Sequence, residues 1–277
     1  MKHYIRREAF TLIELLVVMG IIALLAAITL PVVNGVKRRG LVASETSAAR
    51  QVMVAYAAYA ADNDGALLPG YGDFPAQDDA GKELHSPVSS RYPWRLAPYL
   101  SYDLRILYGK TGDARLVKDR QLEPEAYAYA VSVSPSFGLN TVFVGGDYKT
   151  LNPDNPRATK AYGSFCVRRL SETAHSSRLI VFASAGYESN GAKVPGYFKV
   201  EAPTGTGRRW PKKYDASEGA AAYGHVDFRF EDRALAAMLD GHIELLDFTQ
   251  MDDMRRWSSQ AAEADEPTWV LGQPSDS

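Results

Sequence analysis

Two histidines and two aspartates near the C-terminus carry side chains that divalent metal ions bind. His225 and Asp227 alternate along a predicted strand and would face the same side, while Asp240 and His242 flank the turn that follows. Together they are a candidate metal site. The alternative is that Asp240 serves the turn and both histidines are ordinary strand-end residues. Because sequence spacing fixes no geometry across strands, we favour this alternative and predict no metal.

Other residue patterns that could form a cation site or an active site are supported more weakly than this one. Calcium is a second candidate cation, through loop carboxylates of Asp62, Asp64, Asp78, Asp79, Asp147 and Asp154. None of these has EF-hand spacing, so residues 62–65 are better explained as a turn that ends a helix. The sequence contains no Gly-x-Ser-x-Gly motif and no phosphate-binding loop. We therefore predict neither enzymatic activity nor a bound cofactor.

Composition bounds the remaining classes of site. Cys166 is the single cysteine, so no intrachain disulfide can form, and its neighbours Phe165 and Val167 predict a buried thiol. A net charge of −2 gives no electrostatic reason to expect nucleic acid as a partner. Residues 208–213 form a local basic cluster, which a solvated loop explains better than contact with an anionic polymer.

Glu14 is the acidic residue whose position most needs an explanation. It stands at the head of a long apolar segment, and residues 15–33 carry no charge. A helix from Phe10 to Val33 would measure roughly 35 Å, enough to cross the ~30 Å hydrocarbon core of a bilayer. An acidic residue within such a span costs about 2.5–3.5 kcal/mol on insertion scales. Something must therefore compensate the charge of Glu14.

A secretory signal peptide and an ordinary signal anchor are two interpretations of this segment. A basic start, an apolar stretch and small residues at Ala23, Ala26 and Ala27 are typical of a signal peptide. However, the apolar stretch is longer than the roughly 7–15 residues of such peptides. Neither interpretation explains why an acid should stand near the head of the segment.

A third interpretation comes from the residues around Glu14. The stretch from Ala9 to Glu14, A-FTLIE, followed by LLVVMGIIALLAAITLP, resembles the prepilin cleavage and methylation motif of type IV pilins and type II secretion pseudopilins. The resemblance implies that prepilin peptidase cuts between Ala9 and Phe10 on the cytoplasmic face and methylates the new amino group. The family usually has Gly before the cut. Ala9 is also small, so we expect cleavage.

The spacing of Glu14 suits assembly of copies side by side. It lies four residues after Phe10, about 6 Å along the helix axis, so a neighbouring subunit shifted comparably would bring its amino group beside this carboxylate. At ~4 Å and an effective dielectric near 20, such a pair gains about 4 kcal/mol before desolvation. The alternative, in which Glu14 extends to the cytoplasmic interface, explains neither Phe10 nor the basic leader.

Pro31 is a second point of resemblance. Pilin helices have a proline near the outer end of the membrane segment, where it bends the axis by removing a backbone hydrogen bond. The alternative is that Pro31 merely ends the span. The orientation in the membrane follows from the resemblance alone, because basic residues 37–39 nearly balance the positive charge of the leader.

Beyond Gly35 the sequence predicts a continuation of the helix. Apolar and small residues recur near helical spacing at Val36, Leu41, Ala48, Ala49, Val52, Met53, Tyr56, Tyr59 and Ala60. The other face is assigned to Arg38, Ser44, Glu45, Ser47, Arg50 and Gln51. We expect one long, bent helix from Phe10 to about Ala61, with a globular domain packed on its outer half.

The remaining residues predict an antiparallel β-sheet, which makes the fold class α+β. Residues 65–117 read as loops with a short helix at 94–100. Strands are expected at 126–133, 141–144, 178–184, 197–201, 225–230, 233–239 and 242–248, with a helix at 167–174. Asp240-Gly241 predicts a hairpin turn between the last two strands. Thr249, with Asp252, is expected to cap a last helix that runs through Trp257.

The same Asp240-Gly241 turn resembles the end of a prepilin subfamily in which a histidine precedes Asp-Gly by nine residues. Phe230 stands at that position and His225 is out of register, so only the hairpin is carried over. The expected layout is a leader at 1–9, a transmembrane or filament-core helix at 10–33, its amphipathic continuation at 34–62, an ectodomain at 63–262 and a flexible tail at 263–277.

The predicted function is that of a structural subunit, a pseudopilin or minor pilin of a type II secretion or type IV pilus-like filament. Its expected partners are prepilin peptidase, other pilin or pseudopilin subunits, the inner-membrane assembly platform and the lipid bilayer. It would span the bacterial inner membrane once, with its C-terminal domain periplasmic or extracellular in a filament. The alternative is a prepilin-type anchor that carries an extracytoplasmic module for binding a glycan or another ligand.

Overall fold

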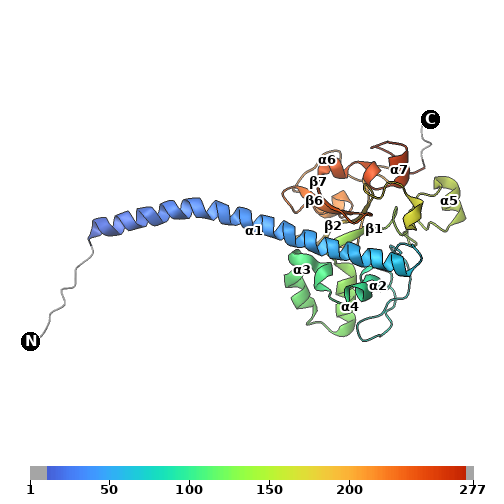
Figure 1. Cartoon of the computed structure of the whole chain (residues 1–277), viewed down its shortest axis with the longest axis horizontal. Helices are drawn as coiled ribbons and strands as arrows, with labels where there is room; N and C mark the ends of the chain where they lie inside the picture. Colours follow the sequence, from blue (N-terminus) through green and yellow to red (C-terminus); the bar gives the residue numbers. More distant parts are fainter. Residues whose placement is uncertain (1–10, 273–277) are drawn as a thin grey trace, which may run out of the picture. The chain divides into compact units, whose positions relative to one another are not determined.

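A computed structural model describes residues 11–272 of the chain (Figure 1). One long helix, α1 (Leu12–Asp62), precedes a mixed α+β domain with a mainly antiparallel sheet, so the predicted fold class is confirmed. The chain divides into two units between Ala43 and Ser44. We call residues 44–272 the head. The division falls within α1, whereas the sequence predicted boundaries at residues 33 and 62.

The outer part of α1 belongs to the head and presents one apolar face to it. Its buried side chains follow a spacing of three and four residues: Ala48, Ala49, Val52, Met53, Tyr56 and Ala60. Arg50 and Gln51, on the opposite face, are exposed as predicted. The helix ends as predicted, because the Gly65 N–H donates to the Ala60 carbonyl at 2.8 Å and Gly65 adopts a positive φ of 79°.

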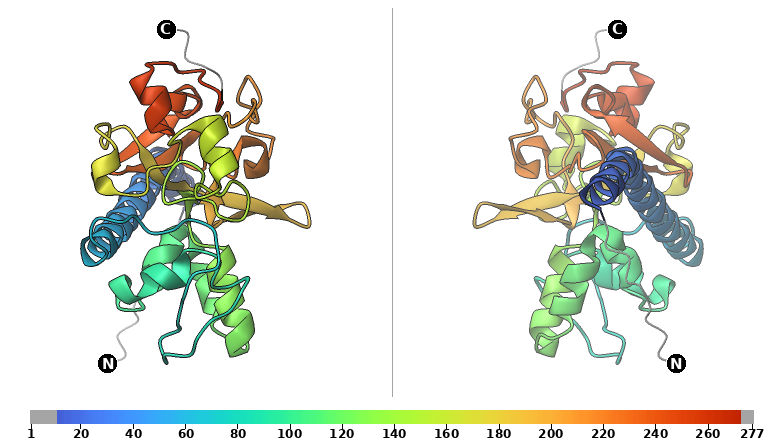
Figure 2. Two further views of the ribbon diagram at one scale, coloured as in Figure 1. Left: turned by 90° about the vertical axis from the view of Figure 1, so that its right-hand side faces the viewer. Right: turned by 90° about the vertical axis from the view of Figure 1, so that its left-hand side faces the viewer.

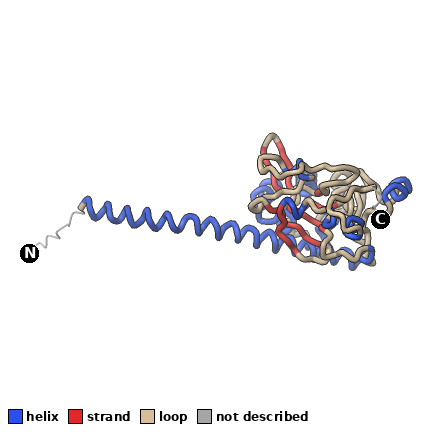
Figure 3. The backbone as a smooth tube through the Cα atoms, turned by 90° about the horizontal axis from the view of Figure 1, so that it is seen from above, coloured by secondary structure: helices blue, strands red, loops and turns tan. Residues whose placement is uncertain are grey.

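The central sheet has five short strands in the order β5-β1-β2-β6-β7. They are β1 (Phe137–Asn140), β2 (Ile180–Ser184), β5 (Lys199–Val200), β6 (Arg233–Met238) and β7 (Ile243–Asp247). All pairs are antiparallel except β1 with β5. Every residue of β2 is buried. This strand is the middle one of the sheet, between β1 and β6. The tube in Figure 3 shows how much irregular chain links these strands.

Short helices and one hairpin complete the head. They are α2 (Pro93–Leu96), η1 (Ala97–Leu100), α3 (Arg105–Asp119), α4 (Pro124–Val133), α5 (Pro156–Tyr162), η2 (Leu170–Glu172), η3 (Ala220–Tyr223), α6 (Phe248–Met251), η4 (Met254–Arg256) and α7 (Ser259–Glu263). Strands β3 (Gly186–Ser189) and β4 (Ala192–Pro195) form a separate hairpin. Figures 1 and 2 place α2, α3 and α4 on one side of the head and α6 and α7 on the opposite side.

Three predictions between residues 100 and 150 are wrong. Residues 126–133 belong to helix α4 and not to a strand, because Pro124 occupies the first helical turn and the alternating alanines suit a helix as well as a strand. Helix α3 was missed, and Gly109 breaks its regular pattern with a φ of 57°. The strand expected at 141–144 lies instead at 137–140, where the residues pair with β2 and β5.

Nearer the C-terminus the predicted hairpin is confirmed, but the predicted strand at 225–230, the helix at 167–174 and the cap of the last helix are wrong. Strands β6 and β7 pair around Asp240-Gly241, where the Gly241 N–H donates to Met238 O at 2.8 Å. Residues 225–230 form no strand, and residues 167–174 contain only the single turn η2. Asp247, not Thr249, caps the next helix, because Asp247 and Gln250 form the capping box, and that helix ends at Met251.

The core of the head is rich in aromatic rings. Trp210 packs edge-to-face on Trp257 with 5.9 Å between ring centroids, and it also contacts Tyr223 and Phe228. Cys166 is buried as predicted, and burial raises the pKa of its thiol. Trp269 and Leu271 are buried in the same core. The flexible tail predicted at 263–277 is therefore wrong as far as residue 272, and residues 273–277 lie outside the described residues.

A buried carboxylate joins the outer part of α1 to the rest of the head. Glu45 is fully buried, although the helical spacing of its neighbours predicted a place on the polar face. Its Oε1 accepts hydrogen bonds from the Thr111 N–H and the Thr111 hydroxyl, both at 2.6 Å. Its Oε2 accepts one from the Ser136 hydroxyl at 3.2 Å and lies 3.8 Å from Arg229. A Cβ at Gly109 would lie 2.6 Å from Oε2, so only glycine fits there.

The Arg229 guanidinium extends this network across the head. It donates to Ser136 Oγ at 2.6 Å, to Asp227 Oδ2 at 3.1 Å and to the Ala185 carbonyl at 2.9 Å. Glu45 and Arg229 are therefore a buried pair whose polar atoms are held by further hydrogen bonds. Such a pair adds little relative to an apolar replacement. Removing Glu45, however, leaves the Thr111 and Ser136 donors without their acceptor and Arg229 with only the Asp227 carboxylate.

We expect Glu45→Ala to lower the free energy of unfolding by about 2–4 kcal/mol, because the buried donors of Thr111 and Ser136 lose their acceptor and Arg229 keeps only Asp227 as a carboxylate partner. Denaturant unfolding of the full chain in micelles, followed by tryptophan fluorescence, measures this, since all four tryptophans lie in the head. The matched control is Arg50→Ala on the exposed face of the same helix, which should cost less than about 0.5 kcal/mol. Equal losses for the two variants would contradict this role of Glu45.

Candidate functional site

The start of α1 is closed by a reciprocal capping box. The Thr11 N–H and the Thr11 hydroxyl both donate to Glu14 Oε2 at 2.9 Å, and Thr11 Oγ1 accepts from the Glu14 N–H at 3.3 Å. A threonine followed three residues later by a glutamate is the signature of this cap, so the sequence carried a local signal that the predictions above did not use. Glu14 therefore has a local structural role in addition to any role in assembly.

The inner part of α1 presents an apolar surface that nothing in the described chain covers. It carries a stretch long and apolar enough to cross a membrane, and none of that stretch is buried. Leu12 is 80% exposed, and other large side chains there are similarly open: Ile13, Leu15, Leu16, Met19, Ile21, Ile22, Leu24 and Ile28. A surface of this kind marks contact with lipid or with other proteins. The segment fits a membrane-anchored, single-pass protein.

Of the other residues predicted to serve processing and assembly, only Pro31 lies within the described residues. Ala9 and Phe10, between which cleavage is predicted, lie outside the described residues. Position 31 lies inside α1, and the helix is assigned without interruption through Pro31 to Asp62. Pro31 therefore does not end the helix.

The first pair of candidate metal ligands lies beside the start of β3. His225 adopts a positive φ of 67°, stacks on the Tyr197 ring at 4.0 Å, and places Nδ1 3.1 Å from the Gly186 carbonyl. Burial lowers the pKa of His225, so the imidazole favours its neutral form. Asp227 accepts a hydrogen bond from Arg229 at 3.1 Å. Both side chains thus have structural partners.

The second pair lies at the opposite end of β2. Asp240 Oδ1 is 2.6 Å from His242 Nδ1, and Glu244 Oε1 is 3.1 Å from His242 Nε2. The Asp240 N–H bonds Ser176 O ahead of β2, whereas the Asp227 N–H bonds Ser184 O at its end. The structure therefore does not bring the two pairs together. Among residues 11–272 no group of three or more His, Cys, Asp or Glu side chains is arranged to hold a metal ion.

The environment of His242 gives a testable pH dependence. Partial burial alone would lower its pKa, but hydrogen bonds to Asp240 and Glu244 outweigh burial and raise it. A raised folded-state pKa stabilises the head below the unfolded pKa of about 6.5, and this contribution is lost as pH rises through the folded value. We expect His242→Asn to destabilise the head more at pH 5.5 than at pH 8.5.

The difference should stay below about 1 kcal/mol, because the pair is solvent-exposed. Urea unfolding of both proteins at the two pH values measures it. His85→Asn, which replaces an exposed histidine elsewhere on the head, is the matched control for the loss of an imidazole. A loss at His242 that is larger at high pH would contradict the assignment.

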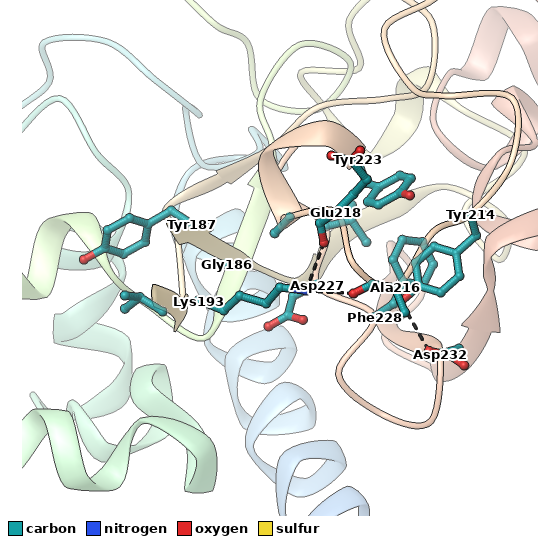
Figure 4. A pocket seen from close by; sticks show the side chains of 13 residues that line it. Gly186, Tyr187, Lys193, Tyr214, Ala216, Glu218, Tyr223, Asp227, Phe228 and Asp232 are labelled. Atoms are coloured by element: carbon teal, nitrogen blue, oxygen red, sulfur yellow. Dashed lines mark hydrogen bonds between the residues drawn. The ribbon is translucent and has the colours of Figure 1, made fainter. Parts of the chain in front are cut away.

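A pocket of about 220 Å³ lies between the β3–β4 hairpin and residues 214–232 (Figure 4). Lys193 Nζ donates to the carbonyls of Ala216 at 2.8 Å and Glu218 at 3.0 Å. The Tyr214 hydroxyl bonds Asp232 Oδ1 at 3.3 Å. These polar groups bind one another and tie the hairpin to the loop beside it, so we assign the pocket a structural role.

Comparison with known proteins gives one finding. Residues 5–30 match the family model of the prokaryotic N-terminal methylation motif. The match supports a pilin-type protein that is processed by prepilin peptidase, and such a motif points to a structural, non-enzymatic family. No curated protein and no solved structure matches the chain. The head is therefore interpreted from its own residues.

Proposed function

We propose that this protein is a pseudopilin or minor pilin of a type II secretion or type IV pilus-like filament. Prepilin peptidase cuts between Ala9 and Phe10 and methylates the new amino group. The inner part of α1 then leaves the bilayer to become part of a filament core. The uncovered apolar surface of residues 12–28 carries the proposal, because it needs a lipid or protein partner both before and after assembly.

Glu14 supplies the specificity of assembly in this proposal. Lipid provides no hydrophobic driving force between helices, so polar contacts gain importance there. In the described chain the side chain of Glu14 bonds only Thr11, which leaves its negative charge without a basic partner. The amino group at Phe10 of a neighbouring copy would neutralise it and gain about 4 kcal/mol before desolvation.

The size of the head favours a minor subunit. Residues 44–272 form a domain with its own aromatic core, which is large for a subunit that repeats along a whole filament. The proposed location is the inner membrane, with the head periplasmic or extracellular. The proposed partners are other pilin-type subunits and the inner-membrane assembly platform. A second candidate function is an anchored binding module, which is favoured by a groove on the head lined by Tyr59, Tyr99 and Tyr102.

Two variants separate the charge of Glu14 from its capping role. Gln also completes a capping box, so Glu14→Gln keeps the cap and removes the charge, whereas Thr11→Ala removes the cap and keeps the charge. We expect Glu14→Gln to reduce incorporation into filaments at least tenfold, because the cationic amino group loses its partner. Incorporation is measured as the crosslinked fraction that co-purifies with pilin-type subunits from membranes of the producing bacterium.

Thr11→Ala should retain most of that crosslinked fraction, since loss of one cap costs only about 1 kcal/mol. Glu123→Gln, which replaces an exposed acid on the head, serves as the control for lost charge alone. Full incorporation of Glu14→Gln with normal protein levels would contradict the proposed pairing. Loss in Thr11→Ala alone would assign Glu14 to helix capping.

A further inference from the structure

A groove of about 680 Å³ lies in the head where α1 ends. Its walls come from the last turn of α1, the loop at residues 69–77, and the short helices α2 and η1. Aromatic rings and polar side chains line it, among them Tyr59, Asp62, Gln77, Tyr99 and Tyr102. The volume falls in the range of roughly 300–1,000 Å³ that small-molecule sites occupy.

The aromatic rings of the groove are held in place but partly open. Tyr59 and Tyr99 meet edge-to-face with 5.6 Å between centroids, and both are half-buried. The Arg95 guanidinium lies 5.1 Å from the centre of the Phe74 ring. Rings fixed in this way can stack on a ligand without first losing much conformational freedom.

The loop that forms one wall is fixed by Arg95. This side chain is buried and donates to three backbone carbonyls, those of Pro69 at 2.8 Å, Gly70 at 2.7 Å and Gly72 at 3.2 Å. Burial lowers the pKa of Arg95 to about 10, which leaves it charged at neutral pH. The groove is therefore preformed.

The polar groups around these rings have unused hydrogen-bonding capacity. The hydroxyls of Tyr59, Tyr99 and Tyr102 form no hydrogen bond with any residue between 11 and 272, and neither do the side chains of Asp62 and Gln77. The pocket in Figure 4 is different, because its lysine and its tyrosine hydroxyl are bonded to neighbouring protein groups. The groove thus combines exposed ring faces with free donors and acceptors.

We propose that this groove binds a neutral carbohydrate chain. Sugar rings present apolar C–H faces that stack on aromatic rings, and their hydroxyls need donors and acceptors around the same rings. Tyrosine hydroxyls and the Gln77 amide offer both, and Asp62 accepts. A proline-rich peptide would use the rings but leave most of these polar groups unpaired. The Asp62 carboxylate also disfavours an anionic ligand.

The test uses the full chain in lipid nanodiscs, because many detergents carry sugar head groups. Cellohexaose, chitohexaose, maltohexaose and xylohexaose are titrated by calorimetry. We expect saturable binding of at least one of them, weakened about tenfold by Tyr59→Ala, which removes a stacking ring. Because Tyr59 packs on Tyr99, the exposed Asp62→Ala and Gln77→Ala are made as well, and each should weaken binding several-fold.

Tyr129→Ala is the matched control, since Tyr129 is a 47% exposed ring outside the groove, and its binding should be unchanged. A folded protein that binds none of the four sugars overturns the inference, as does binding of a decaproline peptide in their place. The inference concerns the head alone. Sugar binding by a chain that never enters a filament would support the carbohydrate site and contradict the filament proposal. A chain that enters filaments but binds no sugar would support the filament proposal and overturn the carbohydrate site.

Discussion

The structure depends on one constraint, that the apolar surface of residues 12–28 has nothing in the described chain to cover it. Burying a single leucine or isoleucine side chain is worth about 1.5–3 kcal/mol, so leaving many of them in water would cost more than a domain's whole stability. The segment must therefore lie in lipid or against other helices. In lipid, association of helices relies on packing and polar contacts, which makes one acidic residue at the head of the segment important.

The two glutamates on α1 illustrate how one helix serves both units. Glu45 has its partners inside the head, where Thr111 and Ser136 donate to it and Arg229 balances its charge, so it stabilises the packing of the helix. Glu14 has only the local bonds from Thr11 within the described residues. Its charge is available to a partner outside the chain. Glu45, whose carboxylate is hydrogen-bonded inside the head, contributes to folding, whereas in the proposed function the uncompensated charge of Glu14 favours assembly.

Prediction from sequence succeeded where the signal was local and strong. The long apolar segment, the stop at Asp64-Gly65 and the hairpin at Asp240-Gly241 each follow from a few adjacent residues. It failed where tertiary contacts decide the conformation or the burial of a residue. Residues 126–133 fit two periodicities, and packing in the head selects the helix. Glu45 looked like a surface residue because its partners lie 66 or more positions away in sequence. The groove could not be predicted, since its walls are distant in sequence.

The intact mass of the protein extracted from bacterial membranes tests the central claim most directly, because a filament-type assembly through Glu14 requires a free amino group four residues away. We predict a chain that begins at N-methylated Phe10 and lacks the first nine residues. A chain that retains Met1, or one that begins beyond Ala27 as after signal-peptide cleavage, would contradict the account.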